Sequence, residues 1–212
     1  MNNIPNKEEF RKMLVQRHGA AYVDKLSKAH VAIAGLGGLG SNIAISLARA
    51  GVGCLDIIDF DTVCLSNLHR QQYMVQDIGR KKAIVMKEKL KSINPYIDIK
   101  TNCVKVNEDN AYEIFQRPGY IVEAFDVPEC KAFLVNFILE NYPNKFVVAS
   151  SGMAGIGDGN KIVTRRITNN LWICGDGVSG IDEGVSLFAA RVAICANHQA
   201  LKTIQLILEN EK

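Results

Sequence analysis

The chain has 212 residues, of which 48% are hydrophobic and 22% are charged, and its formal net charge at pH 7 is +3. This length supports one substantial core, and the small, scattered positive charge argues against a nucleic-acid-binding or membrane-surface protein. No secretory signal and no apolar stretch of about 18 residues, the length of a transmembrane helix, is visible. We therefore expect a cytoplasmic globular protein without a membrane partner.

Strand and helix patterns alternate along the first 150 residues. Residues 6–28 are predicted to form one or two amphipathic helices broken near Gly19, followed by a buried strand at 31–34. Further strands are expected at 55–58, 97–104, 120–124 and 146–149, and helices at 41–50, 80–92, 107–116 and 128–140. This alternation predicts an α/β, Rossmann-like fold with a mostly parallel sheet and helices on both faces.

The last third of the chain has a different texture. Residues 151–184 are rich in glycine and carry short strand-like pieces at 161–167 and 171–174. Residues 185–209 have the spacing of one long amphipathic helix, and the pattern puts Arg191 on its polar face. Because no linker or internal repeat is visible, we expect a single domain over residues 1–212 that begins with a helical segment at 1–28.

The six cysteines do not have the spacing of a metal site. No two of them stand in a CxxC pair; they are Cys54, Cys64, Cys103, Cys130, Cys174 and Cys195. A chain of this length forms a core without disulfides, so we expect reduced, mostly buried thiols and no zinc.

A glycine-rich sequence, Gly35-Leu36-Gly37-Gly38-Leu39-Gly40, lies between a predicted strand and a predicted helix. This is the context in which GxGxxG forms a tight turn, lets backbone approach phosphate and offers the free N–H groups of the next helix to an anion. Asp59 follows 19 residues after Gly40, where a carboxylate can bind ribose hydroxyls. We therefore predict nucleotide binding by Gly35, Gly37, Gly38 and Gly40; the alternative is a purely structural glycine turn.

Polar and charged residues gather after Asp59, the predicted ribose-binding acid: Asp61, Asn67, Arg70 and Lys82. A dehydrogenase has no obvious use for this cluster, whereas a nucleoside triphosphate has, because charge builds on its phosphates during displacement. Arg70 can grip phosphate as a fork, and Lys82 can supply a point charge. The alternative interpretation makes Arg70 a loop residue paired to an acid and Lys82 a solvated helix charge.

Two sequences, GLGGLGSN at 35–42 and DFDTVCLSNLHRQQY at 59–73, resemble the ThiF/MoeB/HesA family, relatives of the ubiquitin-activating enzymes. The resemblance covers roughly residues 31–152, and the remainder is most similar to a short ThiF subtype. It implies an adenylyltransferase that uses ATP and Mg²⁺ to activate the C-terminal Gly-Gly carboxylate of a ubiquitin-like sulfur carrier protein. Pyrophosphate would be released, and the carrier would serve the biosynthesis of the thiamine thiazole.

The resemblance also implies roles for individual residues. It assigns Gly37 and Gly40 to the nucleotide loop and Asp59 to the ribose, and it surrounds the phosphates with Asn67, Arg70 and Lys82, with Lys81 as the neighbour that competes with Lys82 for this role. Asp126 falls where the family has the aspartate needed for adenylation, through Mg²⁺ held with ATP. Asp126 can also cap the helix that begins at Pro128, and the two roles are compatible.

This sequence lacks some features of the family, and other features align with more than one of its residues. Many relatives have two CxxC pairs that bind zinc, which this chain lacks. The resemblance implies a homodimer in which an N-terminal arginine acts across the interface, and both Arg17 and Arg11 are candidates. Cys174 is the candidate for a covalent carrier intermediate, with buried packing as its alternative, and residues 151–184 are the expected carrier-binding, crossover segment. No sulfur-transfer or carrier extension is visible, so we expect a separate sulfur donor.

Three other functions stay open at the level of sequence. The chain could activate another partner, such as a peptide or a molybdopterin-type carrier, or it could be a nucleotide-binding scaffold. An NAD-dependent oxidoreductase is the remaining alternative, although no catalytic histidine or Tyr–Lys arrangement stands out.

Overall fold

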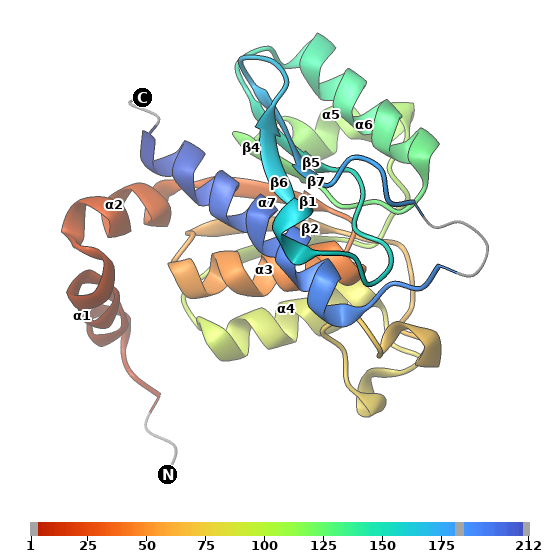
Figure 1. The fold of residues 1–212 in the computed structure, drawn as a ribbon. Coiled ribbons are helices and arrows are strands. Elements are labelled where there is room, and N and C mark those ends of the chain that lie inside the picture. Colours follow the sequence, from red (N-terminus) through yellow and green to blue (C-terminus); the bar gives the residue numbers. More distant parts are fainter. Residues whose placement is uncertain (1–3, 181–184, 210–212) are drawn as a thin grey trace.

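The computed structural model describes residues 4–180 and 185–209, which contain one seven-stranded sheet (Figure 1). Its order is β3-β2-β1-β4-β5-β7-β6, and only the β6–β7 pair is antiparallel. The strands are β1 (His30–Ala34), β2 (Cys54–Ile58), β3 (Asp98–Asn102), β4 (Tyr120–Glu123), β5 (Phe146–Ser150), β6 (Val163–Arg166) and β7 (Leu171–Gly175). The predicted α/β architecture with a mostly parallel sheet is confirmed.

Helices cover both faces of this sheet. One core contains side chains of α3, α4 and α7, and a second core, on the opposite face, contains side chains of α5 and α6. The helices are α1 (Lys7–His18), α2 (Ala20–Lys28), α3 (Gly38–Ala50), α4 (Lys82–Ile93), α5 (Glu108–Phe115), α6 (Pro128–Asn141) and α7 (Ala189–Glu209), with short 3-10 turns η1 (Leu65–Asn67), η2 (Val75–Asp77) and η3 (Gly159–Lys161).

Strand β1 shows why its sequence is apolar without interruption. Val31 and Ile33 face the first core, and Ala32 and Ala34 face the second, so all four side chains are buried. A parallel strand covered on both faces needs apolar residues at every position rather than at alternate ones.

Helix α3 begins earlier than predicted and helix α7 begins later, each for a local reason. Helix α3 begins at Gly38 rather than at residue 41, because glycines of the loop form its first turn despite their low helix propensity. Helix α7 begins at Ala189 rather than at 185. The residues before it are held in extended form, since Gly155 N donates to Ser186 O at 2.8 Å.

The thiols differ from the prediction in burial. All six are free, as expected, but only Cys174 and Cys195 are buried, whereas Cys64 and Cys103 are exposed. The prediction of mostly buried thiols is therefore wrong. Cys64 and Cys103 lie in connections after β2 and β3, and connections run over the surface.

Arg191 is the second correction. Its spacing put it on the polar face of the terminal helix, but its side chain is only 6% exposed. The loop at residues 157–158 and the segment after β7 fold over this face and cover the guanidinium group. Within residues 4–180 and 185–209, no helix combines the length and apolar character needed to cross a bilayer. The end of the glycine-rich segment, 181–184, lies outside the described residues.

Candidate nucleotide-binding site

A cavity of about 580 Å³ opens at the carboxyl ends of the parallel strands. Gly35 directly after β1, Asp59 after β2, Ala124 after β4 and Ser150 at the end of β5 all line it. The chain proceeds outward in opposite directions from the neighbouring strands β1 and β4, toward β3 on one side and toward β5 on the other. Ligands of open α/β sheets bind at such a switch point.

The glycine loop forms one wall of this cavity. Gly35, Gly37 and Gly38 line it, while Gly40 packs underneath the loop. A Cβ atom on Gly40 would lie 1.8 Å from the carbonyl oxygen of Gly35, so no larger residue fits at this position. No side chain caps the first turn of α3, which leaves its N–H groups for an anionic ligand.

Asp59 fixes the glycine loop through hydrogen bonds. One carboxylate oxygen accepts a hydrogen bond from Leu36 N and the other from Asp61 N, both at 2.7 Å. Burial raises the pKa of Asp59, and the nearby Lys82 ammonium and the two N–H donors oppose this shift. The carboxylate therefore fixes the loop against the end of β2 and keeps lone pairs that could accept hydroxyl groups.

Two of the predicted cations line the cavity. The Lys82 side chain is 6% exposed, and its Nζ lies 2.7 Å from Asp61 Oδ2. The Arg70 side chain packs against Gly38, and its Nη1 donates to Ser66 O at 3.3 Å. Lys81 donates to Phe60 O and does not line the cavity, so of the two adjacent lysines only Lys82 borders it.

Asp126 also lines the cavity, from the connection between β4 and α6. Its side chain is exposed and makes no hydrogen bond or ion pair with any described residue. Magnesium prefers hard oxygen ligands and usually binds through one or two carboxylates together with phosphate oxygens. An unpaired carboxylate that lines the same cavity as Arg70 and Lys82 fits this donor set, and Asp126 is thus the residue that could hold Mg²⁺ with a triphosphate.

Other predicted site residues lie away from the cavity wall. Asn67 Oδ1 accepts from Cys64 N at 3.1 Å and closes the turn η1. Cys174 is completely buried on β7, and burial raises the pKa of its thiol to about 11. Arg11 and Arg17 lie exposed on α1, which Figure 1 shows on the opposite side of the molecule from the N-terminal end of α7.

The sequence analysis did not single out Gln71 and Lys131, which line the cavity, or Glu123, which pairs with Lys131. Gln71 is 7% exposed, and its Oε1 is buried with no hydrogen-bond partner among the described residues. Its position next to Arg70 was a usable signal. Lys131 lines the cavity and forms an ion pair with Glu123 at 2.8 Å. A glutamate ending an otherwise apolar strand was the only hint of this pair.

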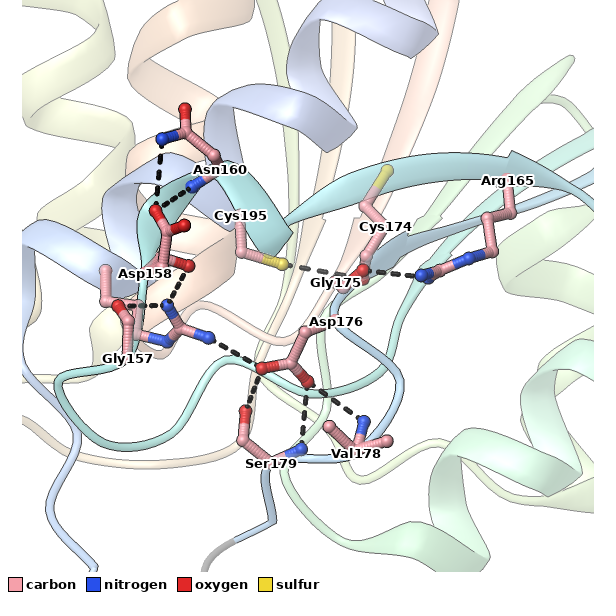
Figure 2. Close-up of polar contacts among 11 residues, drawn as sticks. Gly157, Asp158, Asn160, Arg165, Cys174, Gly175, Asp176, Val178, Ser179 and Cys195 are labelled. Carbon is pink, nitrogen blue, oxygen red and sulfur yellow. Dashed lines mark hydrogen bonds and ion pairs between the residues drawn. The ribbon is translucent and has the colours of Figure 1, made fainter.

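A cluster of hydrogen-bonded residues surrounds Asp176 (Figure 2). Asp176 accepts hydrogen bonds from the hydroxyl and the backbone N–H of Ser179, which lines the cavity, and its carboxylate lies 2.6 Å from Arg191 Nη2. Arg191 also donates to the carbonyl oxygens of Gly157 and Asp158. Burial alone would raise the pKa of Asp176, but the Ser179 donors, the backbone N–H of residue 178 and Arg191 together hold it far below its usual range.

The sequence of the chain matches a known family. The sequence profile of the ThiF family matches residues 10–212. The chain is a member of the ThiF family. Within it, the sulfur carrier protein adenylyltransferase of Thermus thermophilus is 32% identical over 147 residues, which are 67% of this chain and 49% of the relative.

Other relatives have different names. Adenylyltransferase and sulfurtransferase UBA4 of Saccharomyces cerevisiae is 31% identical and covers 93% of this chain and 46% of the relative. The tRNA threonylcarbamoyladenosine dehydratase of Escherichia coli is 33% identical and covers 65% of this chain and 51% of the relative. The chain thus spans about half the length of the curated relatives it matches.

Solved structures share the fold. The E. coli dehydratase TcdA in complex with ATP superposes with a TM-score of 0.86 over 97% of both chains at 20% identity. E. coli MccB with AMPCPP and MccA gives a TM-score of 0.69 at 22% identity, over 92% of this chain and 60% of that one. These likenesses establish a common fold.

Proposed function

We propose that this ThiF-family chain binds ATP and transfers its adenylyl group to the C-terminal carboxylate of a small ubiquitin-like sulfur carrier protein. One observation carries the proposal: Arg70, Lys82 and Asp126 converge on the cavity that the glycine loop borders. Named adenylyltransferases among the relatives, and a fold neighbour solved with ATP, support the choice of nucleotide and reaction.

The proposed step is an in-line displacement. A carboxylate oxygen of the carrier bonds to the α-phosphorus, the bond from that phosphorus to the bridging oxygen breaks, and pyrophosphate leaves as the acyl-adenylate forms. The attacking carboxylate is already ionised at neutral pH, so no general base is required. Arg70 and Lys82 would stabilise the charge that develops on the phosphates, and a closed cavity would limit hydrolysis of the mixed anhydride.

The remaining residues would bind and orient the nucleotide. Asp59 would accept the ribose hydroxyls while it braces the loop, and Asn67 would act near the phosphates. Asp126 would hold Mg²⁺, which when bound neutralises phosphate charge. Lys82, paired with Asp61 in this structure, would turn its ammonium group to the phosphates when ATP binds.

The finer assignment is a carrier that ends in Gly-Gly and serves thiamine thiazole synthesis, with a separate sulfur donor and a homodimeric enzyme. Within such a dimer an arginine of α1 would complete the partner's site. Arg11 is paired with Asp24 at 2.5 Å, whereas Arg17 makes no hydrogen bond or ion pair with any described residue. This favours Arg17 for the role.

A second function has support of its own. The TcdA structures match 97% of both chains, and the E. coli dehydratase is 33% identical. On this alternative, the activated group would be the carboxylate of the modified tRNA nucleoside instead of a protein C-terminus. The weak net charge of +3 argues against a tRNA substrate, which usually requires a pronounced basic surface.

ATP–pyrophosphate exchange tests the proposal. Purified chain would be supplied with radioactive pyrophosphate and ATP, with Mg²⁺ or with EDTA, and with one of three substrates: a Gly-Gly sulfur carrier of the thiamine type, a molybdopterin-type carrier, or threonylcarbamoyladenosine-containing tRNA. We expect exchange that needs both Mg²⁺ and the thiamine-type carrier. Exchange with tRNA alone would select the alternative function, and a chain that binds no ATP would contradict both.

A further inference from the structure

Glu123 is a charged side chain in an unusual place. It ends β4, between the two cores, and is completely buried. A buried carboxylate is costly unless it is paired and hydrogen-bonded. Here Lys131 of α6 supplies the opposite charge, with Nζ at 2.8 Å from Oε2 and 3.0 Å from Oε1.

The Lys131 ammonium group has three N–H donors, and three protein groups accept them. Besides the Glu123 carboxylate, these are Phe125 O at 2.9 Å and Ser150 Oγ at 3.1 Å. An ammonium group can donate no further hydrogen bond once three acceptors are in place. Lys131 lines the cavity, yet its donors are committed to the protein, which argues against a direct role in binding phosphate.

The pair holds both backbone groups of the residue that precedes Asp126. Phe125 N donates to Glu123 Oε1 at 2.7 Å, and Phe125 O accepts from Lys131. Gln199 of α7 donates to Glu123 O at 2.8 Å and so fixes the end of β4. Asp126 itself contacts no described polar group, so the direction of its carboxylate depends on this backbone turn.

We propose that Glu123 and Lys131 are positioning residues that set the turn at 124–127 and thereby aim the Asp126 carboxylate at the metal–triphosphate site. This inference rests on the proposed ATP-binding function. The pair itself does not contact ATP in this proposal, so its loss should impair only the proposed role of Asp126, which is to hold Mg²⁺ with ATP.

The test measures ATP binding by calorimetry with Mg²⁺ and with EDTA, together with pyrophosphate exchange. Lys131→Met leaves Glu123 buried without a partner, so the double variant Glu123→Gln/Lys131→Met, which removes both charges, is studied beside it. Lys131→Arg keeps the charge. Lys145→Met is the matched control, because Lys145 also donates to backbone carbonyl groups, those of Phe115 and Gln116, but does not line the cavity.

We expect the double variant to keep its metal-free ATP affinity within about threefold and to lose most of the gain in affinity that Mg²⁺ gives. Its pyrophosphate exchange should be about 10–100-fold slower, which is the usual effect of removing an outer-shell partner of a metal ligand. Lys131→Arg should recover part of this loss, and Lys145→Met should behave as wild type. Wild-type Mg²⁺ dependence in the double variant would overturn the positioning role. An equal loss of metal-free binding would overturn it too, since that would indicate direct contact with ATP. A wild-type chain that binds no ATP would overturn the proposed function and this inference together.

Discussion

Arg191 of α7 and Asp176 after β7 lie 2.6 Å apart, from Nη2 to Oδ2, with only 6% and 7% of their side chains exposed. The pair joins the last helix to the segment that carries Ser179 to the cavity rim. Gly152 must be glycine beside it, because a Cβ there would lie 2.1 Å from Asp176 Oδ1. A buried ion pair therefore fixes the segment that carries Ser179 at the cavity rim.

Arg191→Ala should destabilise the protein by about 3–5 kcal/mol, because it leaves the Asp176 carboxylate buried without its cation. Urea unfolding followed by circular dichroism measures this change. Arg80→Ala is the control: the Arg80–Glu88 pair is exposed, and such pairs contribute about 0–1 kcal/mol. A loss from Arg191→Ala no larger than that from Arg80→Ala would contradict the prediction.

Asp176 also predicts a pH dependence. Its pKa in the folded protein lies below the ordinary value of 3.8, so ionised Asp176 stabilises the fold above that pH, and this contribution is lost as the pH falls below it. Asp176→Asn should thus be less stable than wild type at pH 7, and the difference should shrink toward pH 2. Urea unfolding at a series of pH values tests this; a difference independent of pH would speak against it.

Arg70→Ala and Asp126→Ala should each reduce pyrophosphate exchange by about 10²–10³-fold, a typical loss for a group that stabilises transition-state charge. Both variants should stay folded, because Asp126 has no polar partner among the described residues and Arg70 packs at the cavity surface. Lys81→Ala, next to the site but outside the cavity, should exchange normally. Near-wild-type exchange in both cavity variants would remove these residues from the mechanism.

Gly40→Ala should abolish ATP binding, because its Cβ would lie 1.8 Å from Gly35 O and displace the loop. Gly119→Ala is the matched control, since a Cβ at Gly119 meets nothing within 4 Å. Calorimetric titration with ATP distinguishes them. Equal affinity in the two variants would show that the loop tolerates the extra carbon.

The thiols should react in two classes. Burial raises the pKa of Cys174 to about 11 and that of Cys195 to about 12, whereas Cys64 and Cys103 are exposed. Iodoacetamide at pH 8, followed by mass spectrometry, should label the exposed pair first, and Cys174→Ser should activate carrier normally. Rapid labelling of Cys174 that parallels loss of activity would instead support a covalent intermediate there.

Much of the fold could be predicted because β1, β2 and β5 are buried on both faces and because α1 and α3 end at glycine. Val31 to Ala34 reads as a buried strand, and Gly51, in the left-handed conformation, ends α3 where expected. The start of a helix is harder to predict when it contains glycine. The first turn of α3 consists largely of glycines, whose low helix propensity argues against a helix.

The site was predictable where one segment carries several functional residues, as from Asp59 to Arg70. The pairs that join distant segments were not. Arg191 meets Asp176 because a loop closes over α7, and helical spacing alone assigns Arg191 to the solvent side. Glu123 meets Lys131 across the start of α6, and only the burial of β4 makes that pair significant.

Helix α7 has a consequence for how the protein is made. It follows the glycine, Asp59 and Arg70 motifs along the chain and contains none of them, yet Arg191 holds the segment that carries Ser179, and Gln199 donates to Glu123 O at the end of β4 and to Val148 O in the middle of β5. A ribosome-bound chain that has reached β7 already carries all of these motifs, but those acceptors and the part of the sheet that α7 covers are still exposed. Nucleotide binding should therefore appear only after α7 has been synthesised and has packed on the sheet.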